Sequence, residues 1–354
     1  MTRQVNCGGV LIGGGAPISV QSMTNTDTRD VDATVAQIAA LSEAGADIVR
    51  CAVPDMEAAA AISKIKPRVD VPIVADIHFD YRLALAAIEN GADKIRINPG
   101  NIRDDAQIRA IALAAKAAGI PIRVGVNSGS LEADLRERFG GPTPEALAAS
   151  AARNIARLRK MDFEDIVVSV KSSDVRESRD ALKLLATCID YPIHIGITEA
   201  GIGERAMIKS AIGIGALLLD GIGDTIRVSL TGDPVREVAA ARDILTSLNL
   251  LPGAINVISC PTCGRCKVDL ARIAAEVSEA IRAIERDRTH AGGEPLTVAI
   301  MGCAVNGPGE ASHADMGVAC GDGKAALFKN GTVAGTISES EIVQAILREL
   351  RLLI

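Results

Sequence analysis

Residues 91–98 read Gly91-Ala92-Asp93-Lys94-Ile95-Arg96-Ile97-Asn98, and residues 45–51 repeat the pattern as Gly45-Ala46-Asp47-Ile48-Val49-Arg50-Cys51. In both places a helical stretch ends at the glycine, where a positive φ angle costs least, and a short β-branched run follows. Alternation of helix and strand is typical of parallel sheets. We predict eight strands, at Ile18–Gln21, Asp47–Cys51, Pro72–Ile77, Lys94–Asn98, Pro121–Asn127, Ile166–Lys171, Pro192–Thr198 and Asp224–Ser229.

Eight such units over roughly 250 residues favour an α/β fold of the (β/α)8 TIM-barrel type over an open doubly wound sheet. Residues 1–16 contain Gly13-Gly14-Gly15 and predict a hairpin or lid at the lower end of the barrel. The loop after the fifth strand, 128–165, contains two helix-like stretches at 131–138 and 144–160. The Gly140-Gly141-Pro142 break in this loop would allow it to move as a lid.

The composition changes after Leu251-Pro252-Gly253. The remaining residues predict a strand, a cysteine loop, a helix at 269–287, a strand at 296–301, short strands and a final helix, which together make an α+β unit. Asn330-Gly331 predicts a two-residue hairpin turn. We therefore expect two domains, a barrel at 1–251 and a smaller α+β domain at 252–354 that contains the cysteine loop.

The composition limits the partners of this chain. Its 354 residues are 48% hydrophobic and carry a formal net charge of -6, which is ordinary for a soluble protein. Aromatic residues make up 2% and Trp is absent, so bases would find no stacking platform and we expect no nucleic-acid partner. The sequence has no signal-peptide pattern and no apolar run long enough for a bilayer. We expect a cytoplasmic protein without a membrane partner.

Basic residues lie at the ends of five predicted strands: Arg50, Arg96, Arg123, Lys171 and Arg227. In a (β/α)8 barrel these positions face the catalytic mouth. Any one of them is more often a solvated loop charge, but five in one cavity repel each other unless an anion compensates them. Guanidinium groups match phosphate oxygens in pairs, so the expected ligand is a diphosphate or polyphosphate.

Two carboxylates, Asp76 and Glu199, lie at strand ends among these bases and are our candidate catalytic residues. Glu199 has two roles open to it. It can form an ion pair with a neighbouring Arg, or it can donate a proton to a leaving oxygen.

Two cysteine motifs follow in the second domain, Ser259-Cys260-Pro261-Thr262-Cys263-Gly264-Arg265-Cys266 and Gly302-Cys303-Ala304-Val305-Asn306-Gly307-Pro308-Gly309-Glu310. Two thiols three positions apart, with a third about forty residues on, predict an iron–sulfur cluster. Structural zinc is the alternative, but zinc ribbons usually bring a second Cys-x-x-Cys. Spacing leaves the fourth ligand open between Cys266 and Glu310. The other cysteines, Cys7, Cys51, Cys188 and Cys320, fit ordinary thiols.

Taken together, the motifs resemble the bacterial two-domain type of the 4-hydroxy-3-methylbut-2-enyl diphosphate synthase family, which belongs to the methylerythritol phosphate route to isoprenoids. The resemblance spans nearly the whole chain. It rests on the two cysteine motifs and on residues 20–26, 75–79, 95–100, 125–127, His194 with Gly196, 198–201 and 224–229.

The resemblance implies one [4Fe–4S] cluster per subunit, held by Cys260, Cys263, Cys303 and Glu310, which leaves Cys266 as a spare thiol. The implied reaction opens 2-C-methyl-D-erythritol 2,4-cyclodiphosphate with two electrons and loss of water, and Glu199 matches the proposed acid. The electron donor would be flavodoxin or ferredoxin. The implied assembly is a homodimer in which the cluster domain of one subunit closes over the barrel of the other. The positions that match substrate contacts are Arg50, Arg96, Arg123, Asn127, Lys171, Arg227, Ser229 and Asn306.

Two other functions compete with this one. A pterin-binding or methyl-transferring barrel would use Asp76, Asn98 and Lys171 to hold a heterocycle, but five cations at the mouth argue against it. An electron-relay module would use the barrel as a scaffold, but it needs no exchangeable ligand such as Glu310.

Overall fold

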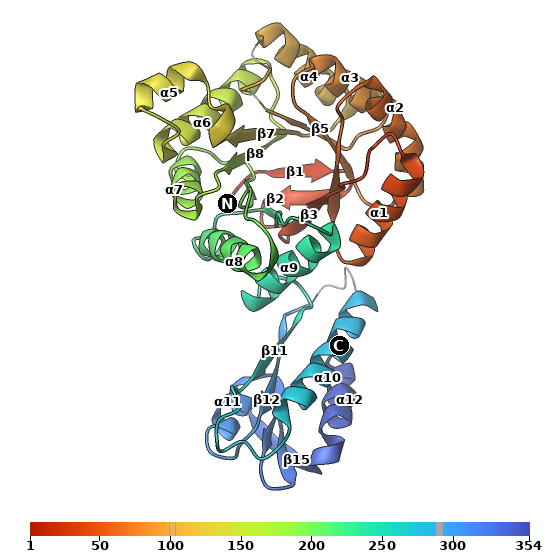
Figure 1. Cartoon of the computed structure of the whole chain (residues 1–354), viewed down its shortest axis with the longest axis vertical. Helices are drawn as coiled ribbons and strands as arrows, with labels where there is room; N and C mark the ends of the chain where they lie inside the picture. Colours follow the sequence, from red (N-terminus) through yellow and green to blue (C-terminus); the bar gives the residue numbers. More distant parts are fainter. Residues whose placement is uncertain (99, 103, 288–292) are drawn as a thin grey trace. The chain divides into compact units, whose positions relative to one another are not determined.

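The structure is a computed structural model that describes residues 1–98, 100–102, 104–287 and 293–354. Pro99, which belongs to one of the motifs above, lies outside the described residues. The chain divides into two compact units, Met1–Ile244 and Leu245–Ile354 (Figure 1). None of the helices in the described ranges combines the length and apolar character that a membrane crossing needs.

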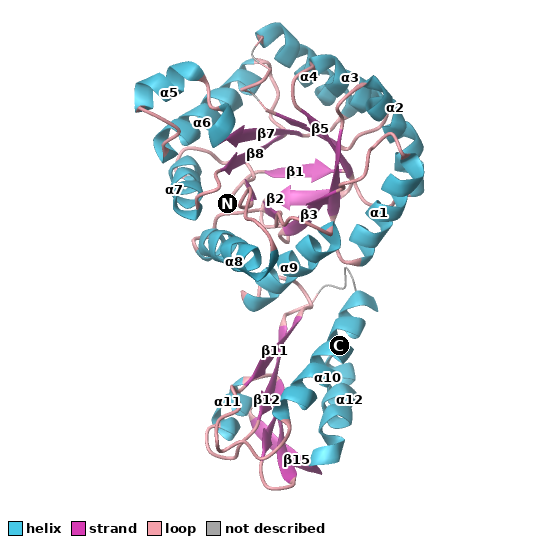
Figure 2. Ribbon diagram, viewed as in Figure 1, coloured by secondary structure: helices cyan, strands magenta, loops and turns pink. Residues whose placement is uncertain are grey.

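The first unit contains an eight-stranded parallel sheet in the order β8-β7-β6-β5-β4-β3-β10-β9. Figure 2 shows helices around the strands of this unit. A single bridge between Val168 and Ile193 joins its two edges. All eight predicted strands are present, and the predicted TIM-barrel fold is confirmed. Their bounds are β3 (Ser19–Met23), β4 (Ile48–Ala52), β5 (Ile73–Ile77), β6 (Lys94–Ile97), β7 (Ile122–Asn127), β8 (Ile166–Lys171), β9 (His194–Ile195) and β10 (Thr225–Ile226).

Helices alternate with these strands and surround them. Gly45 and Gly91 follow α1 and α3 with φ angles of 97° and 89°, as the sequence predicts. The predicted pair of helices after β7 is also present, as α5 and α6. The helices are α1 (Val31–Glu43), α2 (Met56–Ile65), α3 (Tyr81–Glu89), α4 (Asp105–Ala118), α5 (Ala133–Phe139), α6 (Pro144–Lys160), α7 (Val175–Ala186), α8 (Gly203–Leu219) and α9 (Pro234–Ser247), with short 3-10 turns at Lys66–Arg68 and Ser128–Ser130.

Aspartate side chains lie at the N-termini of six of these helices. Backbone N–H groups at the start of α1, α2, α3, α4, α7 and α9 are accepted by Asp30, Asp55, Asp80, Asp104, Asp174 and Asp233. Each of these carboxylates satisfies an otherwise unpaired helix end. These aspartates are therefore engaged locally, although the sequence places them close to the basic strand ends.

A hairpin of β1 (Gln4–Cys7) and β2 (Val10–Gly13) precedes the barrel, as predicted. Its side chains Val5, Cys7 and Ile12 form one buried apolar cluster with Ile48, Val74 and Val167, which lie early in their strands. The hairpin therefore closes the end of the barrel opposite the strand C-termini.

The second unit has a five-stranded sheet in sequence order: β11 (Ile255–Ser259), β12 (Leu296–Met301), β13 (Met316–Cys320), β14 (Lys324–Lys329) and β15 (Thr332–Ser338). Helices α10 (Leu270–Asp287) and α12 (Ile342–Leu353) pack on one face with Val298 and Ile300. Helix α11 (Gly307–His313) contributes Ala311 to the other face, with Ala299 and Met301. A 3-10 turn at Glu339–Glu341 leads into α12.

The predicted hairpin turn between β14 and β15 is confirmed. Asn330 and Gly331 have φ angles of 46° and 79°. Positive φ at both central residues is the geometry that favours Asn-Gly in two-residue hairpins.

Candidate functional site

The barrel strands bring the five predicted basic residues together. Arg50, Arg96, Arg123 and Lys171 lie on β4, β6, β7 and β8 with 8% or less of their surface exposed. Arg227 follows β10 and its side chain is 17% exposed. Burial, and next the charges of Arg123 and Arg50, hold the pKa of Lys171 far below its ordinary value. The five side chains therefore form one electrostatically coupled group, which we call the mouth cations.

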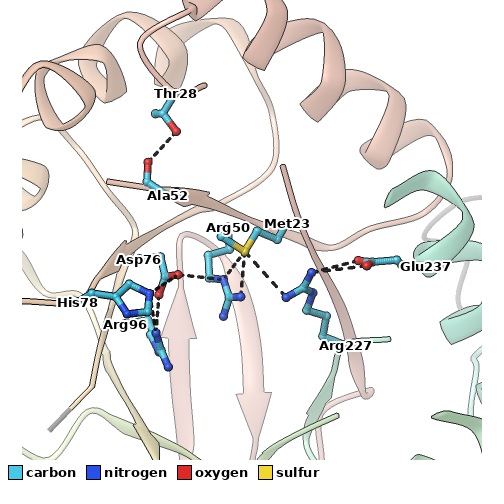
Figure 3. Close-up of polar contacts among 9 residues, drawn as sticks. All are labelled: Met23, Thr28, Arg50, Ala52, Asp76, His78, Arg96, Arg227 and Glu237. Carbon is cyan, nitrogen blue, oxygen red and sulfur yellow. Dashed lines mark hydrogen bonds and ion pairs between the residues drawn. The ribbon is translucent and has the colours of Figure 1, made fainter. Parts of the chain in front are cut away.

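Asp76 of β5 is the buried counter-ion of two mouth cations (Figure 3). Its Oδ1 lies 3.0 Å from Nη1 of Arg96, and its Oδ2 lies 3.8 Å from Nε of Arg50 and 3.2 Å from Nε2 of His78. Burial favours the neutral acid, but Arg50, His78 and Arg96 outweigh it and hold the pKa of Asp76 well below its usual range. The carboxylate therefore stays ionised at neutral pH, which suits it to orient guanidinium groups rather than to donate a proton.

The sequence analysis did not predict two partners of the mouth cations, Glu237 and Met23. Glu237, 4% exposed on α9, lies 3.4 Å from Nη2 of Arg227 and accepts the backbone N–H of Leu230 at 2.8 Å. Met23 lies between two guanidinium groups, with its sulfur 2.9 Å from Nη2 of Arg50 and 3.8 Å from Nη1 of Arg227 (Figure 3). Glu237 has the sequence pattern of an ordinary first-turn acid, so nothing in the sequence separates it from a surface residue.

The cations of the barrel interior outnumber its carboxylates. Within the described residues, Nε of Arg96, Nε and Nη1 of Arg123 and Nε of Arg227 are buried without a hydrogen-bond partner. Burial, then the charges of Arg50 and Arg96, hold the pKa of Arg123 well below its ordinary value, although Asp76 acts in the opposite direction. A buried charge without a partner costs several kcal/mol. This arrangement therefore favours binding of an anion that reaches these nitrogen atoms.

Two glycines make room for the mouth cations. A Cβ atom at Gly125 would lie 2.7 Å from Nε of Arg96. A Cβ atom at Gly196 would lie 2.4 Å from the carbonyl oxygen of Arg227 and 3.3 Å from Nζ of Lys171. Only a residue without a side chain permits these approaches, which explains why both motifs contain glycine.

Glu199 lies in the loop between β9 and α8, exposed to solvent. Among the described residues it has no hydrogen-bond or ion-pair partner, so its carboxylate does not neutralise a neighbouring arginine. Its φ angle of 52° is in the left-handed region, which costs a residue with a side chain about 1–3 kcal/mol. Strain of this kind at an unpaired acid is typical of a functional position.

The remaining predicted contacts are distributed between the two units. Asn127 ends β7 and pairs in register with Lys171, and Ser229 lies two residues after Arg227. Both are half-buried. Asn306 is exposed in the second unit, immediately before α11.

We expect the ligand-free protein to lose stability as the pH falls below 6.5. His194 of β9 is fully buried, both its ring nitrogens lack partners, and burial followed by Arg123 and Lys171 holds its pKa well below 6.5. Below pH 6.5 the unfolded chain therefore binds a proton that the folded chain does not. The free energy of unfolding should fall by up to about 1.4 kcal/mol per pH unit.

Thermal unfolding between about pH 5.5 and 7.5 tests this prediction. In that range the thermal midpoint of His194→Gln should depend less on pH than that of the wild type. An equally steep dependence in the variant would contradict it.

The second unit places the cysteine motifs at the ends of two neighbouring strands. Cys260 follows β11 and Cys303 lies two residues after β12. Cys263 is exposed, and Thr262 before it has a φ angle of 50°, an outlier for a β-branched residue. Glu310 is exposed on α11. In the described part of the chain, no three His, Cys, Asp or Glu side chains are placed to hold a single metal ion.

Backbone amides surround the cysteine sulfurs. The N–H groups of Asn306, Val305 and Gly307 hydrogen-bond to Cys303 and lower the pKa of its thiol. Gly302 donates its N–H to Sγ of Cys260 at 3.3 Å. Amides directed at sulfur stabilise thiolate ligands, so the surroundings of Cys260 and Cys303 fit two ligands of an iron–sulfur cluster.

Comparisons with known proteins agree with both units. The family model described as the GcpE TIM-barrel domain matches residues 2–242, and that of the GcpE protein C-terminal domain matches residues 256–352. The chain is 54% identical over 350 residues to the 4-hydroxy-3-methylbut-2-en-1-yl diphosphate synthase (flavodoxin) of Caldanaerobacter subterraneus subsp. tengcongensis, covering 99% of this chain and 96% of the relative. It is 51% identical over 349 residues to the protein of the same name from Geobacter sulfurreducens, covering 99% of this chain and 97% of the relative.

Among solved structures, the type I 3-dehydroquinate dehydratase of Clostridium difficile matches 70% of this chain and 98% of its own length. The TM-score is 0.51 and the sequence identity 14%. At that identity the two proteins share a fold and no more.

Proposed function

The chain belongs to the family of 4-hydroxy-3-methylbut-2-en-1-yl diphosphate synthases, and from that premise we propose how its residues perform the reaction. The enzyme is an iron–sulfur oxidoreductase. It converts 2-C-methyl-D-erythritol 2,4-cyclodiphosphate to (E)-4-hydroxy-3-methylbut-2-enyl diphosphate by two-electron reductive ring opening and dehydration. The observation that carries the proposal is the group of buried, incompletely paired guanidinium nitrogens inside the barrel.

We propose that the mouth cations hold the diphosphate. The unpaired nitrogens of Arg96, Arg123 and Arg227 would bind its oxygens, and a charge-assisted hydrogen bond contributes about 1.5–3 kcal/mol. Lys171 and Arg50 would add charge, and Asn127 and Ser229 would add neutral contacts. Asp76 and Glu237 would fix the guanidinium planes, a positioning role in place of the catalytic one expected for Asp76 from the sequence.

We propose that Glu199 supplies the proton that the departing hydroxyl needs. Its carboxyl is exposed and unpaired among the described residues, so no ion pair has to break before it meets a ligand. Its backbone lies in the left-handed region, and strain of this kind clusters at functional sites.

We propose that Cys260, Cys263, Cys303 and Glu310 hold one [4Fe–4S] cluster per subunit. When bound, such a cluster would pass electrons from the donor protein to the substrate one at a time, until the two that the ring opening consumes had been delivered. The amides at Cys303 and Cys260 support thiolate ligands there. Glu310 contributes a hard oxygen donor, which exchanges more readily than a thiolate.

The relatives' names support flavodoxin as the electron donor. We propose ferredoxin as the alternative donor and the cytoplasm as the location. Reduced flavodoxin or ferredoxin, each added to the purified enzyme, would show directly which of them supports turnover.

Anaerobic purification, followed by iron and sulfide analysis and by turnover of the cyclic diphosphate with a low-potential reductant, tests the proposed function. We expect iron and sulfide in equal amounts and release of the allylic diphosphate. Zinc without sulfide would overturn the cluster proposal, and absence of turnover with a loaded cluster would overturn the proposed roles in the barrel.

We expect Arg123→Met to weaken diphosphate binding while it stabilises the ligand-free protein. The change removes a buried charge with two unpartnered nitrogens, and replacing such charges by apolar groups often gains about 1–4 kcal/mol. Loss of its charge-assisted bonds should lower the affinity for inorganic pyrophosphate roughly 10- to 100-fold.

Thermal unfolding with and without pyrophosphate measures both effects. Arg109→Met, on the exposed side of α4, is the matched control and should change neither. An unchanged pyrophosphate affinity in Arg123→Met would contradict the proposed binding role.

We propose a homodimer in which the second unit of one subunit brings its cluster ligands and Asn306 to the barrel of the other. The family resemblance implies this assembly. Helix α8 offers an apolar face for contact between subunits, since Ile208, Ile212 and Leu219 are 59%, 59% and 76% exposed. These spacings place the three side chains on one side of the helix.

Ile212→Glu should weaken the dimer about tenfold or more, because a charge would then face an apolar interface. Analytical ultracentrifugation over a concentration series measures the effect. Leu113→Glu on α4, at a position of similar exposure, is the control. Equal dissociation constants for the two variants would exclude α8 from the interface.

A further inference from the structure

Three cysteines meet in the second unit on the α10 side of its sheet. Cys320 of β13 belongs to the buried apolar cluster, and Cys260 and Cys266 pack against it partly exposed. The proposed ligand set uses only Cys260 of these three. Cys266 is the spare thiol of the first cysteine motif.

Gly302 brings the sulfurs of Cys260 and Cys266 to one side of its backbone. A Cβ atom there would lie 2.5 Å from Sγ of Cys266 and 3.5 Å from Sγ of Cys260. Any side chain at this position would therefore collide with Cys266 and touch Cys260. Glycine leaves the space between the two thiols open.

Backbone hydrogen bonds fix both cysteines against Gly302. The glycine donates its N–H to Sγ of Cys260 at 3.3 Å, and its carbonyl oxygen accepts the N–H of Lys267 at 3.1 Å. The loop also turns back on itself, because Cys266 donates its N–H to the carbonyl oxygen of Cys263 at 2.9 Å. The two sulfurs are thus held on the same side of Gly302.

We propose that Cys260 and Cys266 form a reversible disulfide when the second unit carries no cluster and meets hydrogen peroxide. The consequence for the cluster rests on the proposed function, since it requires Cys260 to be a ligand. The disulfide itself requires only the two thiols. Disulfides in reducing compartments are usually transient and redox-sensing, which fits such a role.

The chemistry needs one peroxide for two thiols. The Cys260 thiolate attacks one peroxide oxygen, the O–O bond breaks, and the sulfur becomes a sulfenic acid as the other oxygen leaves as water. The Cys266 sulfur then displaces the hydroxyl, which leaves as a second water. Two thiols lose two electrons and peroxide gains them. Cys320 is fully buried, so peroxide reaches the partly exposed Cys260 and Cys266 before it reaches Cys320.

The Cys260–Cys266 disulfide would protect Cys260, a proposed cluster ligand, from irreversible oxidation. A sulfenic acid without a neighbouring thiol goes on to sulfinic acid, which is irreversible for most proteins. With Cys266 beside it, oxidised Cys260 stops at the disulfide, and a thiol reductant restores it for a new cluster.

Peptide mapping of cluster-free protein tests the proposal. Trypsin cuts after Arg242, Arg265 and Lys267, so Cys266 is released in the dipeptide 266–267, and Cys260 lies in the peptide 243–265. After peroxide treatment and alkylation we expect the two peptides to be linked, and dithiothreitol to separate them. Cys263→Ser should keep the link and Cys260→Ser should lose it. A freely alkylated Cys266, or a link lost in Cys263→Ser, would overturn the proposal.

Cluster reassembly supplies a second measurement. After peroxide and then dithiothreitol, wild type and the exposed-thiol control Cys188→Ser should regain their iron and sulfide content. Cys266→Ser should not, because its Cys260 has been oxidised past recovery. Equal recovery in all three would refute the protective role, whereas failure of untreated protein to hold iron and sulfide would count against the ligand set.

Discussion

Cys303→Ser should give a folded protein with no iron–sulfur cluster and no reductive activity. Three backbone N–H groups converge on the Cys303 sulfur and lower the pKa of its thiol, so this position is built for a thiolate. A serine hydroxyl does not ionise near neutral pH and is a poor ligand for iron in a cluster that thiolates hold. Iron and sulfide content after anaerobic purification, with circular dichroism as a check of folding, measures the loss.

Two variants serve as controls for this result. Cys188→Ser removes an exposed thiol of the first unit, and Cys266→Ser removes the spare thiol of the cysteine loop. Both should keep normal iron and sulfide when purified without oxygen. A full cluster in Cys303→Ser would remove that residue from the ligand set, and loss of the cluster in Cys266→Ser would make Cys266 the fourth ligand in place of Glu310.

Glu199→Gln should lower kcat by about 10²–10⁴ with little change in KM, because a positioned general acid contributes a factor of that size. The amide keeps the shape of the side chain and removes only its proton. Steady-state turnover with a chemical reductant, which bypasses the electron-donor protein, measures kcat and KM. Iron and sulfide content should match wild type.

Glu199→Gly removes the carboxyl group and also relieves the backbone strain at this position, so it separates the effect of the acid on activity from the effect of the strain on stability. The φ angle of 52° suits glycine, so the thermal midpoint of this variant should not fall, although its activity should fall as far as in Glu199→Gln. Glu204→Gln, an exposed acid in the first turn of α8, is the matched control and should turn over normally. Wild-type turnover in Glu199→Gln would rule out the acid role.

Most strands of the barrel were predictable because a glycine or proline precedes or begins the β-branched run. Ile166–Lys171, which has neither, was predictable from its β-branched residues alone. The lengths of two of these strands were not predictable from the sequence. The sequence predicts Pro192–Thr198 and Asp224–Ser229, whereas β9 and β10 have two residues each. An extended run in the sequence shows the conformation that its residues favour and says nothing of whether a neighbouring strand satisfies its N–H groups.

The mouth cations were predictable because barrel topology places every strand end at one mouth. Their partners were not, because these contacts depend on how adjacent elements fold back on each other. Glu237 reaches Arg227 and the N–H of Leu230 from the start of the following helix, and Met23 meets Arg50 across neighbouring strands. The pairing of Cys260 with Cys266 likewise depends on a glycine of another strand end.

The single bridge between Val168 and Ile193 makes the junction of β8 and β9 the least connected part of the barrel wall. Lys171 ends β8 on one side of that junction, and Arg227 follows β10 on the other. A diphosphate held by both would link the two edges of the sheet where the backbone does so only once. Bound substrate would then connect the two sides of the junction between β8 and β9, which the backbone joins by one bridge. The stability of the closed barrel would therefore increase with the concentration of substrate in the cell.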